Sequence, residues 1–263
     1  MLLQVVLFSI PLSIIFLPLQ PHSTVSASRL FFSVIATMSS DSPIASVNSN
    51  DSQYEIMEER LAYSRWRTIV QRRVRSPKGH IIDFDVIGQR IHDSTAPIEV
   101  HGAVLALAYH TETKSFTLIR EYNPGSHCIL YGPAAGMLES GSKHNNSNPL
   151  VAAQMELEEE CHLAGGTWYR LVDEVNERTS RYFPLGGVFV GKYENTEMVP
   201  YLVVDPVLVS NPRPLDATED IEIVRHVTLE ELRRMLTSGQ MTVVGSWTAL
   251  LALDKLRQLG EID

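Results

Sequence analysis

The sequence is short of cysteine and of basic side chains, and each shortage excludes a class of protein. Its two cysteines, Cys128 and Cys161, cannot form the disulfide framework that staples small secreted domains. There are 22 lysines and arginines against 31 aspartates and glutamates, a net charge of -9. A broad basic surface for nucleic acid is therefore excluded, and an anionic ligand needs local help such as a metal ion. Glycine and proline are not in excess, which excludes a fibrous or mostly disordered chain.

The N-terminal segment differs in composition from the rest of the 263 residues. Leu2 to Leu19 is strongly apolar, and no acidic residue precedes Asp41. Residues 1–37 are therefore expected to be a signal or targeting leader, and residues 38–56 a flexible polar linker. Translation from Met38 is the alternative. The first reading predicts a secreted or organellar protein, the second a cytoplasmic one. Neither predicts a stable membrane span after processing, because prolines interrupt the apolar run.

Residues 57–263 are expected to form one folded domain. Residues 57–68 are predicted as a short helix or lead-in, 132–136 as a turn and 140–148 as a loop. A helix is predicted from Pro149 to a stop at Gly165–Gly166, and further helices over 228–237 and 246–259. Strands are predicted over 81–87, 103–109, 116–122, 129–131, 188–190, 198–204 and 221–224. This order favours an α/β (α+β) fold in which mixed sheets are sandwiched between helices.

The helix after Pro149 carries an unusual concentration of carboxylates. Glu159 and Glu160 follow Glu156 at i+3 and i+4, so all three share one face, whereas Glu158 points elsewhere. Oxygen ligands on a rigid helix are what Mg²⁺ requires. The alternative is a solvated acidic face without function.

The neighbourhood of this helix resembles the Nudix hydrolase family, whose box reads G-x5-E-x7-R-E-U-x-E-E-x-G-U, with U aliphatic. Six residues match the box: Gly136, Glu156, Leu157, Glu159, Glu160 and Leu163. Three residues depart from it: Ser142 stands at the first Glu, Met155 at the Arg and His162 at the late Gly. The spacing from Gly136 to Glu156 is also five residues longer than in the box. The resemblance implies a Nudix-type fold and metal ligation by Glu156, Glu159 and Glu160.

Beyond the box, the chain resembles the ADP-ribose and ADP-sugar pyrophosphatase branch of that family. The segment Leu118–Asn123 looks like the branch's strand before the box, which leaves Arg120 to contact a phosphate or ribose. The resemblance also implies that the Ala135 carbonyl completes the metal shell and that Gly136 lies at the substrate. Glu219 is the closest match to a metal-bound or general-base carboxylate, with Glu197 as a second candidate. Glu159 would serve both the metal and catalysis.

The implied reaction is Mg²⁺-dependent hydrolysis of ADP-ribose or another ADP-sugar to AMP and a sugar phosphate, with Mn²⁺ as an alternative metal. Relatives of the branch imply a homodimer. Two other functions stay open: a nucleotide-binding module that no longer hydrolyses, and hydrolysis of a dinucleotide polyphosphate or coenzyme A.

Two further features have mainly structural interpretations. His162 is expected to cap the acidic helix through its imidazolium. The arginines of the cluster at 72, 73 and 75 are expected on a solvated surface, with contact to a phosphate as the alternative.

Overall fold

The computed structural model describes residues 54–263 except 66, 90–100, 139–147, 174–184 and 216–218. The leader, the linker, Ser142 and most of the expected loop at 140–148 lie outside the described residues. No helix within the described ranges is both long enough and apolar enough to cross a membrane.

Three antiparallel strands in the order β1-β2-β3 form the first sheet: β1 (Glu55–Ser64), β2 (Arg67–Arg75) and β3 (Ile81–Gln89). The prediction for β3 is confirmed, but that of a helix or lead-in at 57–68 is wrong, because β1 pairs with β2 along its length. Its glutamates, arginine and alanine suit a helix, and pairing with a neighbouring strand overrides that preference.

The arginine cluster lies on β2 and is held by carboxylates of its own sheet. Arg72 pairs with Glu59 at 2.6 Å, Arg75 with Glu55 at 2.8 Å, and Arg73 with Asp83 at 2.9 Å. Cross-strand ion pairs of this kind stabilise the register of neighbouring strands. These contacts favour the structural interpretation of the cluster.

The second sheet is the centre of the fold, with the strand order β10-β11-β4-β5-β13. β4 (His101–His110) and β5 (Ser115–Asn123) form the predicted hairpin. β11 (Thr196–Val204) pairs with β4 in parallel and β13 (Ile221–Thr228) with β5 in antiparallel, so the sheet is mixed as predicted. Three strands join it from the side: β6 (Cys128–Gly132), β7 (Ala134–Met137) and β9 (Thr167–Arg170). β10 covers Val188–Phe189.

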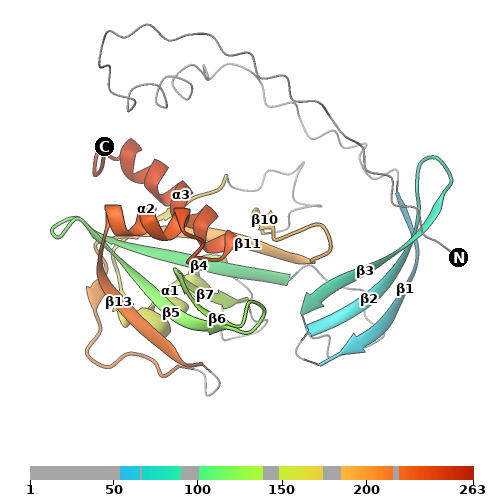
Figure 1. Cartoon of the computed structure of the whole chain (residues 1–263), viewed down its shortest axis with the longest axis horizontal. Helices are drawn as coiled ribbons and strands as arrows, with labels where there is room; N and C mark the ends of the chain where they lie inside the picture. The colour runs from blue at the N-terminus through green and yellow to red at the C-terminus, as the bar shows by residue number, and fades with distance from the viewer. Residues whose placement is uncertain (1–53, 66, 90–100, 139–147, 174–184, 216–218) are drawn as a thin grey trace, which may run out of the picture. The chain divides into compact units, whose positions relative to one another are not determined.

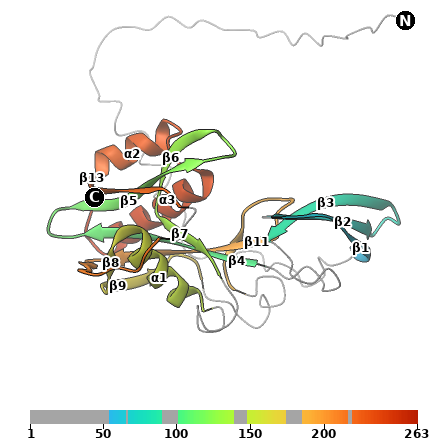
Figure 2. The ribbon, with the colours of Figure 1, turned by 90° about the horizontal axis from the view of Figure 1, so that it is seen from below.

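Helices cover both faces of the second sheet (Figures 1 and 2). α1 (Pro149–Cys161) packs on one face through Ala153 and Leu157, against Val104 and Ile119. α2 (Leu229–Thr237) and α3 (Val243–Gln258) pack on the other, against a core that includes Phe116. This sandwich confirms the α/β fold class. A small sheet joins β8 (Leu163–Ala164) to β12 (Val207–Leu208) beyond the end of α1.

Local capping signals set the helix ends. Asn148 caps α1 by accepting from the N–H of Leu150 at 3.0 Å, and Pro149 occupies the first turn as predicted. The Thr228 capping box that begins α2 is also confirmed. α3 begins three residues before its predicted start, because the Thr242 hydroxyl accepts from the N–H of Gly245 at 3.2 Å.

The C-terminus of α1 differs from its prediction. The helix ends at Cys161, before Gly165–Gly166, because His162 has a left-handed backbone with φ 55°. The backbone N–H of His162 bonds the carbonyls of Leu157 and Glu158, so the cap is a backbone one and needs no imidazolium. Glycine takes positive φ without strain, whereas His162 adopts it with a side chain.

The segment predicted as a turn at 132–136 is mostly strand. β7 begins at Ala134 and pairs with β4, with Ala135 opposite Leu105 and Gly136 opposite Val104. This pairing runs β7 along the sheet beside α1, and the two make close contact.

Candidate active site

Three carboxylates of α1 are buried against the sheet. Glu156, Glu159 and Glu160 are 8%, 9% and 3% exposed, respectively. Glu158 lies on another side of the helix, where it pairs with Arg213 at 3.3 Å. The division of these carboxylates between faces is the one that helical spacing predicts. Because these three side chains are buried, a solvated acidic face is excluded for them. Buried carboxylates usually have a ligand or a strong interaction.

The lack of a side chain at Gly136 makes room for the side chain of Glu156. A Cβ atom on Gly136 would lie only 2.1 Å from Cδ and Oε1 of Glu156. The absence of a side chain on β7 therefore allows the carboxylate to pack directly on the strand backbone. Gly132, at the end of β6, has open space at the equivalent position.

Glu160 is fixed by the backbone of β7. Its Oε2 accepts a hydrogen bond of 2.7 Å from the N–H of Ala135. The N–H and C=O of one strand residue point to the same edge, so the Ala135 carbonyl also lies on the edge of β7 that faces α1. The predicted carbonyl ligand is thus on the same side as the carboxylates.

Burial raises the pKa of Glu160 to about 9. The hydrogen bond from Ala135 opposes this rise, and the negative charges of Glu156, Glu219 and Glu121 add to it. At neutral pH the metal-free carboxyl is therefore protonated. A divalent cation bound here would lower the pKa of Glu160, because a positive charge favours the ionised carboxylate and the neighbouring carboxylates disfavour it.

Glu121 is a site residue that the sequence analysis missed. On β5, Glu121 shares a face with Ile119, which packs in the core beneath α1. Its side chain is exposed to solvent. Partial desolvation of its carboxyl, followed by the negative charge of Glu219, raises the pKa of Glu121. The signal was present in the alternation of Ile119 and Glu121, two residues apart on a predicted strand.

Glu219 lies near these carboxylates although it is distant in sequence. It is exposed, and it lies just before β13, which begins at Ile221. Ile221, at the start of β13, is opposite Glu121 in the strand register. The charge of Glu219 acts on both Glu121 and Glu160, so the structure brings this candidate base toward the helix carboxylates.

Arg120 lies on the other face of the sheet from Glu121, because neighbouring residues of a strand alternate. Its guanidinium pairs with Glu222 of β13 at 2.6 Å. The structure does not bring Arg120 together with the carboxylates of α1.

Glu197 is enclosed in the protein core rather than in a loop. It is the second residue of β11 and is 0% exposed. Its carboxylate accepts hydrogen bonds from the N–H groups of Gly187 at 2.5 Å and Leu185 at 3.1 Å. These contacts assign Glu197 to holding the chain before β10.

The carboxylates fit a hard divalent cation in chemistry but are not gathered around one point. Among the described residues, no three carboxylate, imidazole or thiol side chains form a ready-made cation site. The oxygen donors, the place for Glu156 over Gly136 and the buried Glu160 carboxyl match what Mg²⁺ takes.

The mixed sheet, with α1 on one face and α2 and α3 on the other, is a Nudix-like fold. A solved structure similar to this chain is a crystal structure of an ADP compounds hydrolase. The two chains are 17% identical, with a TM-score of 0.59, and the match covers 80% of this chain and 97% of that one. No protein-family model and no curated protein matches the sequence. The likeness shows the fold.

Proposed function

We propose that the protein hydrolyses ADP-ribose or another ADP-sugar to AMP and a sugar phosphate, with Mg²⁺ or Mn²⁺ as cofactor. The observation that carries the proposal is the burial of Glu156, Glu159 and Glu160 on the side of α1 that faces the sheet. The likeness to an ADP compounds hydrolase supports the choice of substrate class.

Glu156, Glu159 and Glu160 would hold the metal, with the Ala135 carbonyl completing its shell. When bound, the metal neutralises the pyrophosphate and polarises the phosphorus that water attacks. Gly136 allows the Glu156 carboxylate to lie against β7, where it would meet the metal and the substrate. A carboxylate locked by a backbone hydrogen bond, as Glu160 is to Ala135, keeps its position during turnover.

Glu219 would accept the proton of the attacking water. Its exposure allows the carboxylate to meet water and substrate, and its charge already acts on Glu121 and Glu160.

The direct test is a substrate panel with the purified protein. ADP-ribose, ADP-glucose, a dinucleotide polyphosphate and coenzyme A are incubated with Mg²⁺ or with EDTA, and nucleotide products are separated chromatographically. We expect AMP release from ADP-ribose or ADP-glucose in the presence of Mg²⁺ and no AMP release in EDTA. Turnover of only coenzyme A or the dinucleotide would contradict the proposed substrate class.

A nucleotide-binding module without turnover is the second candidate. One observation favours it. Half-buried Met155 stands directly before Glu156, where the Nudix box has arginine, and therefore no guanidinium at this position orients the carboxylates. Thermal stabilisation by ADP-ribose without AMP release would support this candidate and reject the hydrolase.

A homodimer is proposed as the working assembly. One face of the three-stranded sheet exposes large apolar side chains, among them Ile56, Leu61 and Ile82. Exposed apolar side chains gathered on one face of a sheet are typical of an interaction surface. Light scattering coupled to size-exclusion chromatography should give twice the chain mass, and Ile56→Lys with Ile82→Lys should give the monomer.

A further inference from the structure

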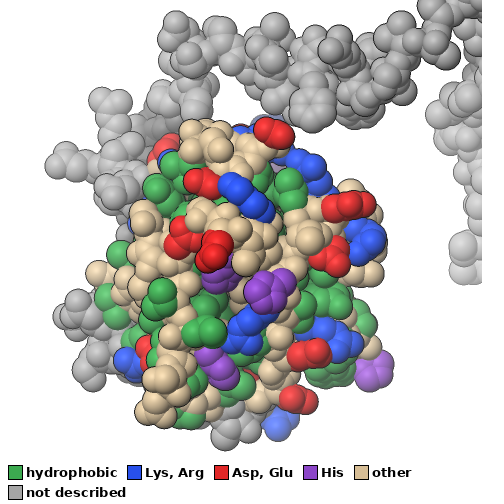
Figure 3. All heavy atoms as spheres, turned by 90° about the vertical axis from the view of Figure 1, so that its left-hand side faces the viewer, with side chains coloured by type: hydrophobic (Ala, Val, Ile, Leu, Met, Phe, Trp, Pro, Cys, Tyr) green, Lys and Arg blue, Asp and Glu red, His purple; other side chains and the backbone are tan. Residues whose placement is uncertain are grey.

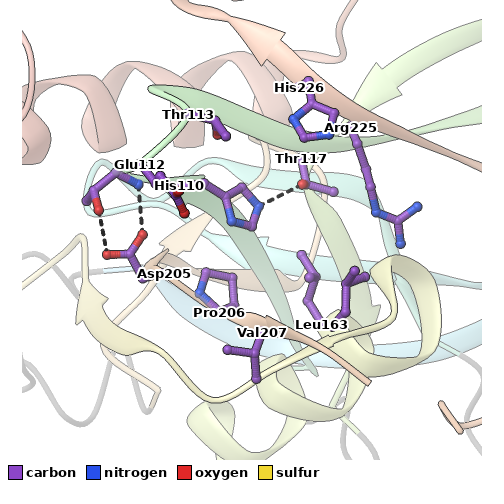
Figure 4. A pocket seen from close by; sticks show the side chains of 12 residues that line it. His110, Glu112, Thr113, Thr117, Leu163, Asp205, Pro206, Val207, Arg225 and His226 are labelled. Atoms are coloured by element: carbon purple, nitrogen blue, oxygen red, sulfur yellow. Dashed lines mark hydrogen bonds between the residues drawn. The ribbon is translucent and has the colours of Figure 1, made fainter. Parts of the chain in front are cut away.

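A pocket of about 520 Å³ lies at the end of the second sheet where β4 turns into β5 (Figure 4). Its walls come from this turn, from Leu163 at the end of α1, from β12 and from the middle of β13. None of the carboxylates proposed to hold the metal lines this pocket. It is therefore a cavity apart from the carboxylate cluster.

One wall carries three basic side chains: His110, Arg225 and His226. Arg225 and His226 lie at a bulge of β13, where the register with β5 shifts between Val224 and Val227. His226 has a left-handed backbone with φ 58°, which non-glycine residues seldom adopt. Bulges redirect side chains away from the regular alternation, and here two successive basic residues both reach the pocket.

Two of the three basic side chains, His110 and Arg225, have definite local partners. Nε2 of His110 lies 3.0 Å from the Thr117 hydroxyl. Arg225 donates one hydrogen bond of 3.2 Å to the carbonyl of Cys161, the last residue of α1. A guanidinium has five N–H groups, so Arg225 keeps donors for a ligand while it is anchored. Figure 3, which views this end of the molecule, shows histidine and basic side chains close together.

Two acidic side chains, Asp205 and Glu112, also line the pocket. Both carboxylate oxygens of Asp205 are bound by Thr111, through its N–H at 2.7 Å and its hydroxyl at 2.8 Å. Glu112 is exposed in the turn. Burial lowers the pKa of His110; the charge of Asp205 opposes this change, and the charges of His226 and Arg225 add to it. The two basic residues of β13 therefore act at His110 in the sense that favours an anion, and Asp205 acts against them.

The facing wall is apolar. Leu163 is buried, whereas Val207 and Leu208 of β12 are 63% and 69% exposed. Two neighbouring aliphatic side chains with this exposure at the rim of a pocket leave apolar area for a ligand to cover.

We propose that this pocket binds a small organic phosphate, with the phosphate against Arg225, His226 and His110 and the apolar body against Leu163, Val207 and Leu208. A guanidinium binds phosphate through paired N–H groups, and imidazoles add further donors. The site is distinct from the carboxylate cluster, which would need a metal to accept the same anion.

Phenyl phosphate tests the proposal, with inorganic phosphate and benzyl alcohol as partial probes. The full chain is titrated in EDTA, so that no cation recruits phosphate to Glu156, Glu159 and Glu160. Binding is measured by calorimetry and by NMR of the histidine rings. We expect saturable millimolar or tighter binding of phenyl phosphate, weaker binding of inorganic phosphate and none of benzyl alcohol. The pKa of the His110 ring should rise on binding.

Three variants locate the binding. Arg225→Gln should weaken binding about tenfold, as expected for the loss of charged hydrogen bonds. Because Arg225 also supports the end of α1, His226→Asn provides a second variant whose side chain tolerates the positive φ. It should weaken binding several-fold without loss of stability. Lys192→Gln, an equal change of charge at an exposed residue outside the pocket, should leave binding unchanged. Equal binding by all variants, or no saturable binding at millimolar phenyl phosphate, would overturn the proposal. Either result leaves the metal-dependent hydrolysis untouched.

Discussion

The carboxylate of Glu160 accepts a hydrogen bond of 2.7 Å from the backbone N–H of Ala135. This contact joins the acidic helix α1 to strand β7 at the place where both Gly136 and Glu156 also meet. It gives an otherwise costly buried carboxyl one strong partner.

Replacing Glu160 with glutamine should stabilise the metal-free protein at alkaline pH. Between the ordinary pKa of 4.5 and the folded value of about 9, the folded protein keeps a proton that the unfolded chain has lost, so stability falls as the pH rises. Glu160→Gln removes this linkage. Urea unfolding in EDTA should show a gain of about 1 to 3 kcal/mol at pH 8 and little change at pH 4. A variant that is less stable than wild type at pH 8 would show that the carboxylate is stabilised in its ionised form.

Adding one methyl group at Gly136 should damage the site more than the fold. In Gly136→Ala the new Cβ would overlap Cγ, Cδ and Oε1 of the buried Glu156 side chain, which must therefore shift. The displaced carboxylate should lower AMP release at least about tenfold, with a loss of about 1 to 2 kcal/mol in unfolding free energy.

Gly132→Ala is the matched control for Gly136→Ala, because its Cβ meets nothing within 4 Å. It should retain activity within a factor of about two. Equal loss of activity in both variants would mean that the strand backbone, rather than the position of Glu156, is responsible.

The end of α1 should become more stable when glycine replaces His162. His162 has φ 55°, where a side chain is strained and glycine is not. Thermal or urea unfolding should place His162→Gly above wild type by about 0.5 to 1 kcal/mol, and His162→Ala below wild type by a similar amount. If His162→Gly instead destabilises, the imidazole rather than the backbone caps the helix.

Glu197 should prove to be a stabilising residue without a catalytic role. In Glu197→Gln, the side-chain NH₂ group would face the backbone N–H of either Gly187 or Leu185, so two donors would meet without an acceptor. We expect a loss of about 1 to 3 kcal/mol in unfolding free energy and an unchanged KM for the ADP-sugar at temperatures where the variant is folded. Loss of turnover without loss of stability would return Glu197 to the candidate bases.

Elements with strong local signals were predictable from the sequence. The Pro149 helix start, the Thr228 capping box and the hairpin between β4 and β5 depend on residues close together in the chain. The helical spacing of Glu156, Glu159 and Glu160 also placed them on one face, apart from Glu158.

The features that were missed depend on pairing between distant segments. β1 has helix-forming residues and becomes a strand through β2, and β7 was predicted as a turn but pairs with β4. Strand alternation separates Arg120 from Glu121, but the packing of α1 on Ile119 decides which face of β5 belongs to the site. The basic pocket could not be predicted, because a bulge in β13 breaks the alternation that sequence reasoning assumes.

The most direct test of a metal-dependent site on α1 compares Glu159→Gln with Glu158→Gln. Both variants remove one carboxylate from the same helix, but Glu159 is only 9% exposed and Glu158 pairs with Arg213 on another side of the helix. AMP release from ADP-ribose with saturating Mg²⁺ is the measurement. We predict at least about a 100-fold loss for Glu159→Gln and activity within about threefold of wild type for Glu158→Gln. Full activity in Glu159→Gln, or equal losses in both variants, would contradict a metal site on this face of the helix.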